Sequence, residues 1–96
     1  MVPLLDALRR HAARGTASFH TPGHKGRLEP GCAAAFDLTE LPDTGSLYDG
    51  GDAIEASERL CAEAFGAGDS FYSAGGCTLC IQTMLLLACG GAGGRI

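Results

Sequence analysis

The sequence predicts an α/β fold, because segments typical of helices alternate with a segment typical of a strand. Segments 3–14 and 52–65 each carry apolar residues on one helical face, and the segment from residue 77 to about residue 88 is apolar nearly all round. Before the third of these, residues 69–74 form a short apolar and aromatic run of strand length. Arg95-Ile96 reads as the first step of another strand. We therefore expect the beginning of a larger α/β domain, truncated at residue 96.

The first helix is predicted from Pro3 to Arg14. Proline is well tolerated in the first turn of a helix, and Gly15 follows as a stop signal. The apolar side chains that share one face are Leu4, Leu5, Leu8 and Ala12. Residues 1–17 are therefore interpreted as an N-terminal helix or arm that precedes the main domain at 18–96.

The second helix has the clearest start signal. Asp52 is expected to accept from the free N–H groups of the first turn, and Glu55 three positions later completes a variant of the capping box. Gly66 is expected to end this helix. Between the first two helices, proline and glycine pairs predict a long ordered loop, which in a compact domain is usually functional or part of a larger assembly.

The junction between the predicted strand and the third helix has the outline of a phosphate-binding turn. Gly75-Gly76 follows the strand, and Cys77-Thr78 opens the helix. The first N–H groups of a helix lack internal partners, and the helix dipole favours an anion there. Glycine pairs at such turns also serve tight packing alone, so the pattern leaves both interpretations open.

Cys77 and Cys80 form a CxxC pair at the same helix start, which allows two further interpretations. One is a thiol redox module. The other is a zinc module in which the two thiols join His20 and His24, although Pro22-Gly23 breaks helical register between the histidines. We expect no metal, and we interpret the remaining cysteines as small apolar residues.

Charge and cysteine content narrow the class of protein. The net charge is −4, but residues 1–27 carry five cations against one carboxylate, so the first helix is a candidate docking surface. The odd number of cysteines, five, argues against a secreted disulfide framework and fits reduced thiols in a cytoplasm. The apolar run 79–89 is shorter than the roughly 20 residues that span a bilayer. We expect neither a membrane nor a nucleic acid as partner.

Several segments, taken together and in order, resemble the ornithine/lysine/arginine decarboxylase family. FHTPGHKG resembles its HxPGHKxG signature, and FDLTEL resembles its D-x-T-E-L segment. The stretch from GSLYD through IEA to AEAFGA resembles a third family segment, and FYSAGGCT resembles the strand that ends in NGST. The segments that carry this resemblance are 19–26, 36–41, 45–67 and 71–78.

The resemblance implies the incomplete N-terminal part of a fold-type-I, aminotransferase-like major domain that uses pyridoxal phosphate. It implies a cytoplasmic lyase of polyamine biosynthesis, a homodimer or larger oligomer, that decarboxylates lysine, arginine or ornithine. Gly76, Cys77 and Thr78 then match the turn that holds the cofactor phosphate. His20, His24 and Lys25 match a loop close to the active site, although their histidines could equally cap backbone groups.

Two departures from the family pattern matter. Gly75 and Cys77 replace an asparagine and a serine, and a thiol is a weaker hydrogen-bond donor than a hydroxyl. The family's Schiff-base lysine lies beyond residue 96, so no catalytic residue is assigned, and Lys25 does not take that role. We therefore expect the 96-residue chain to be inactive alone. An aminotransferase, a thiol or zinc module, and a non-catalytic interaction fragment remain alternatives.

Overall fold

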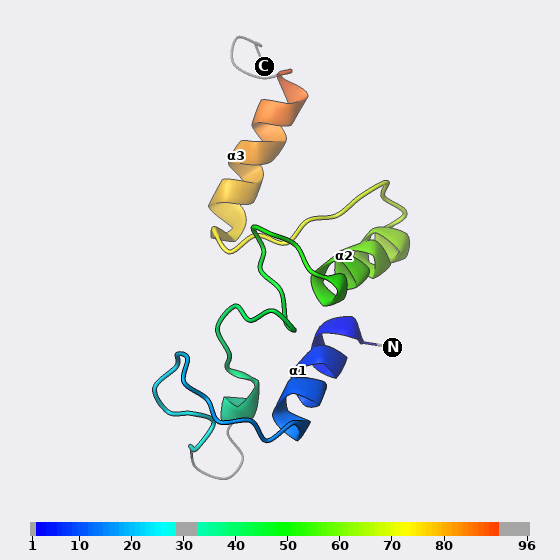
Figure 1. Cartoon of the computed structure of the whole chain (residues 1–96). Coiled ribbons are helices and arrows are strands. Elements are labelled where there is room, and N and C mark those ends of the chain that lie inside the picture. Colours follow the sequence, from blue (N-terminus) through cyan, green and yellow to red (C-terminus); the bar gives the residue numbers. More distant parts are fainter. Residues whose placement is uncertain (1, 29–32, 91–96) are drawn as a thin grey trace.

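The computed structural model describes residues 2–28 and 33–90 of the chain. In this part the order of elements is α1 (Pro3–Ala13), the short 3-10 helix η1 (Ala33–Phe36), α2 (Asp52–Phe65) and α3 (Gly76–Ala88) (Figure 1). The three predicted α-helices are confirmed, each to within two residues at its ends. Residues 95–96, where a further strand was predicted, lie outside the described residues.

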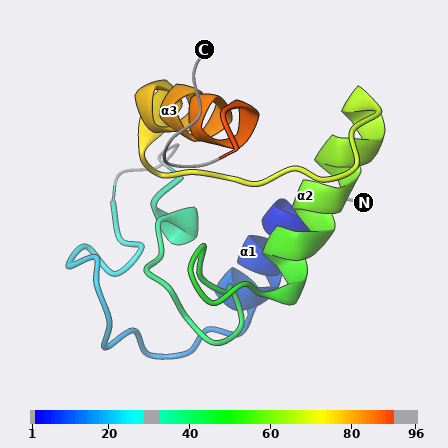
Figure 2. The ribbon, with the colours of Figure 1, turned by 90° about the horizontal axis from the view of Figure 1, so that it is seen from above.

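The small core of the described residues forms where α1 packs against α2 and η1. Its buried apolar side chains are Ala7, Ala34, Ile54 and Ala62. Most of them are alanines, so the helices gain close contact but bury little apolar area. Figure 2 shows α1 and α2 lying side by side, with the loop 37–51 wrapped beside them.

The start of α2 differs from the prediction in one detail. Gly51 occupies the N-cap position and Asp52 is the first helical residue, so the predicted cap by the Asp52 side chain is wrong. The carboxylate of Glu55 does reach back, and its Oε1 accepts from the Gly51 N–H at 3.4 Å. Half of the capping box is thus present. Gly66, with φ of 64°, ends the helix as predicted.

The predicted strand at 69–74 is not a strand in the described part of the chain. The segment is extended coil, and the pairing found among the described residues is limited to the isolated bridges Leu41–Gly45 and Ser46–Gly50. A strand requires a neighbour that satisfies its backbone groups. Here the segment is held by side chains of α2 instead, as described below, so the α/β fold class stays a prediction.

Helix α3 projects from the rest of the described residues and packs against neither α1 nor α2 (Figure 1). Its large apolar side chains are exposed, from 46% at Leu85 to 77% at Leu87. The radius of gyration is 17.1 Å, whereas a compact chain of this length has one of about 12–13 Å. The molecule is therefore elongated, at 53 × 27 × 24 Å.

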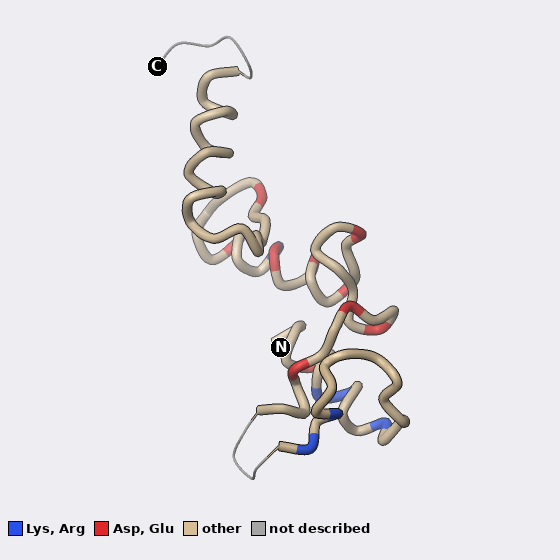
Figure 3. Tube along the Cα trace, turned by 90° about the vertical axis from the view of Figure 1, so that its left-hand side faces the viewer, with Lys and Arg blue, Asp and Glu red and all other residues tan. Residues whose placement is uncertain are grey.

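Charge is divided along the long axis of the molecule. Most Lys and Arg residues lie on α1 and the loop that follows it, whereas Asp and Glu occupy the middle (Figure 3). Helix α3 carries no charged residue at all. None of the helices within the described residues is both long enough and apolar enough to cross a membrane.

Candidate functional site

The turn before α3 presents backbone donors that no cap covers. Gly75 is the N-cap residue of α3, and no side chain caps the helix from that position. Gly76 has φ of 70°, a conformation that glycine adopts without strain. Because the first N–H groups of a helix have no partner within it, those of Gly76, Cys77 and Thr78 point into the space ahead of α3.

The same turn has room for an anion. A Cβ built on Gly76 would meet no heavy atom within 4 Å, and the side chains of Cys77 and Thr78 are exposed. Free N–H groups, the positive end of the helix dipole and a threonine hydroxyl form a donor set that suits a phosphate group. The three residues predicted to bind cofactor phosphate therefore lie together, in an arrangement that fits that role.

The segment that leads into the turn is anchored on α2. The Tyr72 N–H donates to Oε1 of Glu58 at 2.8 Å, and the Ser70 hydroxyl donates to the Glu58 carbonyl at 2.6 Å. The Tyr72 hydroxyl also lies 2.7 Å from Oγ of Ser57. Glu58 thus holds residues 70–72 against α2 through both its carboxylate and its backbone carbonyl.

A shallow pocket lies beside the turn. It has a volume of about 330 Å³ and is lined by Leu47, Tyr48, Leu79 and the segment 72–75. The loop that contains Tyr48 therefore faces the start of α3 across a space of molecular size. A group held at the turn would have these two tyrosine-bearing segments, around Tyr48 and Tyr72, as neighbours.

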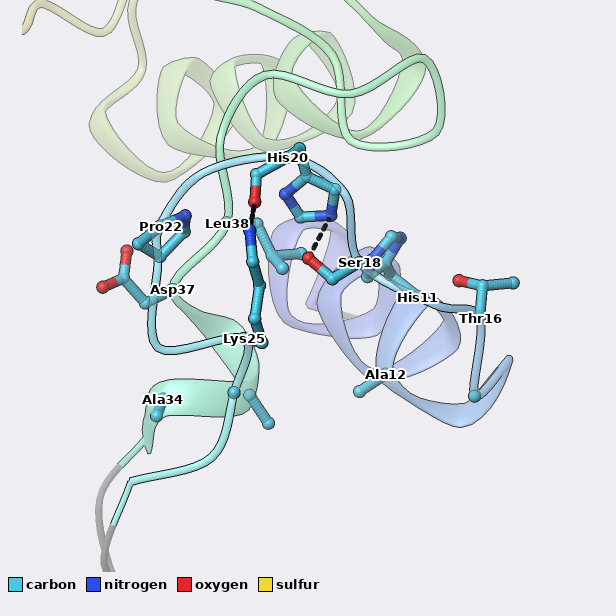
Figure 4. Close-up of a pocket in the computed structure, with 13 residues that line it drawn as sticks. His11, Ala12, Thr16, Ser18, His20, Pro22, Lys25, Ala34, Asp37 and Leu38 are labelled. Carbon is cyan, nitrogen blue, oxygen red and sulfur yellow. Dashed lines mark hydrogen bonds between the residues drawn. The ribbon is translucent and has the colours of Figure 1, made fainter.

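The loop of residues 19–26, which carries His20 and His24 and is called the histidine loop below, borders a second pocket of about 190 Å³ (Figure 4). His20 lies in it, with Nε2 3.3 Å from Oγ of Ser18 and Nδ1 2.6 Å from the carbonyl oxygen of Thr21. The Lys25 ammonium donates to the His20 carbonyl, which closes the loop on itself. His11 of α1 contributes its ring from the other side, with the two imidazole centroids 6.1 Å apart.

His24 does not share this pocket with His20 and Lys25. Its Nε2 lies 3.1 Å from Oδ2 of Asp37, and its Nδ1 accepts from the Gly26 N–H at 3.0 Å. Both ring nitrogens therefore have partners that hold the loop in shape. One of these partners is a backbone group, as the alternative of a capping histidine requires, and a place of His24 near an active site stays a prediction.

The structure reveals one polar cluster that the sequence did not indicate. Oδ2 of Asp43 lies 2.9 Å from Nδ1 of His11 and 2.7 Å from a guanidinium nitrogen of Arg14. The hydrogen bond from His11, helped by the charge of Arg14, lowers the pKa of Asp43 below its ordinary value. A carboxylate in the loop thus ties residues 41–51 to α1.

The two predicted groups of site residues do not share a pocket. His20 and Lys25 line the pocket of about 190 Å³, whereas Gly75, the residue before Gly76, Cys77 and Thr78, lines the pocket beside Tyr48. Across residues 2–28 and 33–90, no cluster of three or more His, Cys, Asp or Glu side chains could hold a metal ion.

Comparison with known proteins relates the chain to arginine decarboxylases. It is 34% identical over 97 residues to a Bacillus subtilis protein of that name. The alignment covers 92% of this chain and 20% of the relative. Proteins of the same name from Bacillus cereus and Halalkalibacterium halodurans are 35% and 31% identical, each over 92% of the chain. The chain spans about a fifth of the length of these curated relatives. No family model and no solved structure matches it.

Proposed function

We propose that this chain forms part of a pyridoxal-phosphate-dependent decarboxylase of a basic amino acid. The observation that carries the proposal is the start of α3 at Gly75-Gly76, where no side chain caps the helix, in a chain that is similar to arginine decarboxylases over 92% of its length. Among arginine, lysine and ornithine, the names of the relatives favour arginine as the substrate.

In this proposal the chain supplies the phosphate end of the cofactor site. The N–H groups of Gly76, Cys77 and Thr78 donate to the phosphate oxygens, and the Thr78 hydroxyl adds a further donor. Charge-assisted hydrogen bonds of this kind are stronger than neutral ones, so a few of them fix the position of a dianion. Because Cys77 is a weak donor, the backbone groups carry most of the binding.

The chemistry of carbon dioxide loss belongs to the cofactor, which when bound acts as an electron sink for the carbanion that remains. The residues of this chain would orient the bound cofactor and enclose its phosphate end. Tyr48 and Tyr72 lie in segments that line the pocket next to Gly75, directly before the proposed phosphate donors. No residue of the chain is assigned to proton transfer or to covalent attachment of the cofactor, and the 96-residue chain is proposed to be inactive alone.

The remaining features of the proposal follow from the family resemblance. The fold would be of type I, with segment 69–74 joining a sheet as a strand, in a cytoplasmic homodimer or larger oligomer. In that setting His20 and Lys25, which already share a pocket, would lie near the active site. An aminotransferase on the same fold is the competing activity, because fold does not determine reaction.

A chimera tests the proposal. The segment of the Bacillus subtilis arginine decarboxylase that matches this chain is replaced by the chain. The purified chimera is then assayed for bound pyridoxal phosphate and for carbon dioxide release from arginine, lysine and ornithine. We expect cofactor retention and decarboxylation. A chimera that has the oligomeric state and helix content of the parent but neither binds the cofactor nor releases carbon dioxide contradicts the proposal. Transamination without decarboxylation would favour the aminotransferase.

A further inference from the structure

Cys77 and Cys80 are a pair of free thiols at the first turn of α3, and their arrangement has a use beyond phosphate binding. We propose that they form a reversible disulfide, which makes this turn a site of thiol oxidation. The disulfide itself is independent of the proposed function. Only its effect on the phosphate turn rests on that function.

The spacing of the two residues brings their side chains together. Residues three apart in a helix lie on one face, with Cβ atoms roughly 5–6 Å apart. A disulfide needs Cβ atoms at about 3.8 Å and Cα atoms within about 4.4–6.8 Å. Ideal helix geometry places Cα atoms of residues three apart at about 5 Å, which meets the Cα requirement. Closure therefore needs a tightening of the first turn that brings the Cβ atoms roughly 1–2 Å closer.

The preceding glycines permit that tightening. Gly75-Gly76 precedes Cys77 directly, and no side-chain cap holds the start of α3 in place. A Cβ at Gly76 would meet nothing within 4 Å, whereas one at Gly75 would clash with the Leu79 side chain, so Gly76 is the position with room for the turn to move. A turn closed by a cap or packed against α2 would resist the same movement.

Accessibility separates this pair from the other described cysteines. Cys77 and Cys80 are exposed, whereas Cys61 in α2 and Cys89, the C-cap residue of α3, are only partly exposed. Helix α3 has no acidic residue, and its N-terminal end favours anions. An anionic disulfide such as oxidised glutathione therefore meets no repulsion from α3 on its approach to the pair.

The proposed step is thiol–disulfide exchange with a glutathione-type disulfide as oxidant. The thiolate of one cysteine attacks a sulfur of the oxidant, which breaks the oxidant's S–S bond and releases one glutathione thiolate. The second cysteine then attacks the mixed disulfide, forms the Cys77–Cys80 bond and releases the second glutathione. The protein loses two electrons and two protons, and two reduced glutathione molecules carry both.

Closure of the disulfide would alter the phosphate turn in one direction. It removes the Cys77 S–H and draws the first turn of α3 toward Cys80. The N–H groups of Cys77 and Thr78 then no longer point at the position proposed for the phosphate. Loss of one well-directed hydrogen bond to a charged group corresponds to roughly a tenfold loss of affinity. Oxidation is therefore expected to weaken cofactor phosphate binding by about that factor.

Thiol mapping of the intact chain tests the disulfide. The chain is equilibrated with mixtures of oxidised and reduced glutathione, alkylated and digested for mass spectrometry. We expect a Cys77–Cys80 linkage that forms as the oxidised share rises and disappears with dithiothreitol. C80S should instead retain glutathione on Cys77, and C89S should behave as the unaltered chain. Glutathione retained on Cys77 of the unaltered chain, or linkage of either cysteine to a different one, would overturn the proposal.

Cofactor retention by the chimera described above tests the coupling. Bound pyridoxal phosphate is measured with the pair reduced and with the pair oxidised, with C80S as the control that cannot close. A tenfold weaker binding confined to the oxidised unaltered pair supports the coupling, and equal binding in both states refutes it. If the reduced chimera binds no cofactor, the proposed function fails while the mapped disulfide stands.

Discussion

Asp43 and His11 are 32 residues apart in the sequence, yet Oδ2 of the carboxylate lies 2.9 Å from Nδ1 of the imidazole. The same oxygen lies 2.7 Å from the Arg14 guanidinium. One carboxylate thereby joins the end of α1 to the loop 41–51, whose bridges at Leu41–Gly45 and Ser46–Gly50 give it a defined shape. This contact holds the loop against the end of α1.

The first prediction concerns pH. Because the folded state lowers the pKa of Asp43, its contribution to stability is present above its ordinary pKa of 3.8 and is lost as the pH falls through the lowered value. Asp43→Asn should therefore destabilise the chain at pH 6 and have a progressively smaller effect below pH 4, measured by urea unfolding at each pH. Asp49→Asn, at an exposed position of the same loop, is the matched control. A constant difference between Asp43→Asn and the unaltered chain from pH 6 to pH 2 would contradict this account.

The second prediction concerns the anchoring of segment 70–72 by Glu58. Glu58→Ala removes the acceptor of the Tyr72 N–H and should cost roughly 1 kcal/mol locally. The segment should then be cut faster by chymotrypsin after Phe71 and Tyr72. Glu63→Ala removes an exposed carboxylate from the same helix and should leave the cleavage rate unchanged. Equal cleavage rates in the two variants would show that the hydrogen bonds to Glu58 do not hold the segment.

The third prediction concerns the Thr78 hydroxyl. In the chimera, Thr78→Val keeps the shape of the side chain and removes the donor, so pyridoxal phosphate should bind roughly tenfold more weakly. Thr78→Ser keeps the donor and should bind nearly as the unaltered chimera does. Fluorescence titration of the cofactor gives both affinities. If the serine and valine variants bind equally, the hydroxyl makes no contact with the phosphate.

The fourth prediction concerns the apolar surface of α3. Leu87 is 77% exposed and Met84 is 63% exposed. Contiguous exposed apolar surface binds hydrophobic dyes and promotes association. Replacement of both residues by lysine should lower the fluorescence of anilinonaphthalene sulfonate and reduce self-association in sedimentation velocity. Val2→Lys, at an exposed apolar residue outside α3, should change neither; an equal fall in that variant would assign the dye binding to another surface.

Patterns local in the sequence predicted the helices well. Pro3 marked the start of α1, Gly66 marked the end of α2, and Gly75-Gly76 marked the start of α3. Each signal acts within a few residues of itself, because capping and backbone conformation are local properties. The turn at Gly76 to Thr78 was located at the start of α3 for the same reason, and its role in binding phosphate stays a prediction.

Features that depend on distant partners could not be found in this way. Asp43 carries no local sign that His11 will face it, and Glu58 looks like any solvent-facing glutamate of an amphipathic helix. The segment 69–74 has strand composition, but a strand exists only through its neighbour, and the described residues supply a helix side chain in that place. His24 likewise required its partner Asp37 to be distinguished from His20.

The separation of α3 from α1 and α2 has a consequence for how the chain opens. A helix of 13 residues with no packed neighbour among the described elements has only its own backbone bonds to sustain it, and isolated helices shorter than about 12–15 residues are marginal in water. The amide hydrogens of α3 should exchange with deuterium at rates set by helix fraying. Those around Ile54 and Ala62 should exchange more slowly, because they become accessible only when α1 and α2 separate. We therefore expect α3 to open separately from the α1–α2 pair, with the turn at residues 75–78 at the border between the two parts.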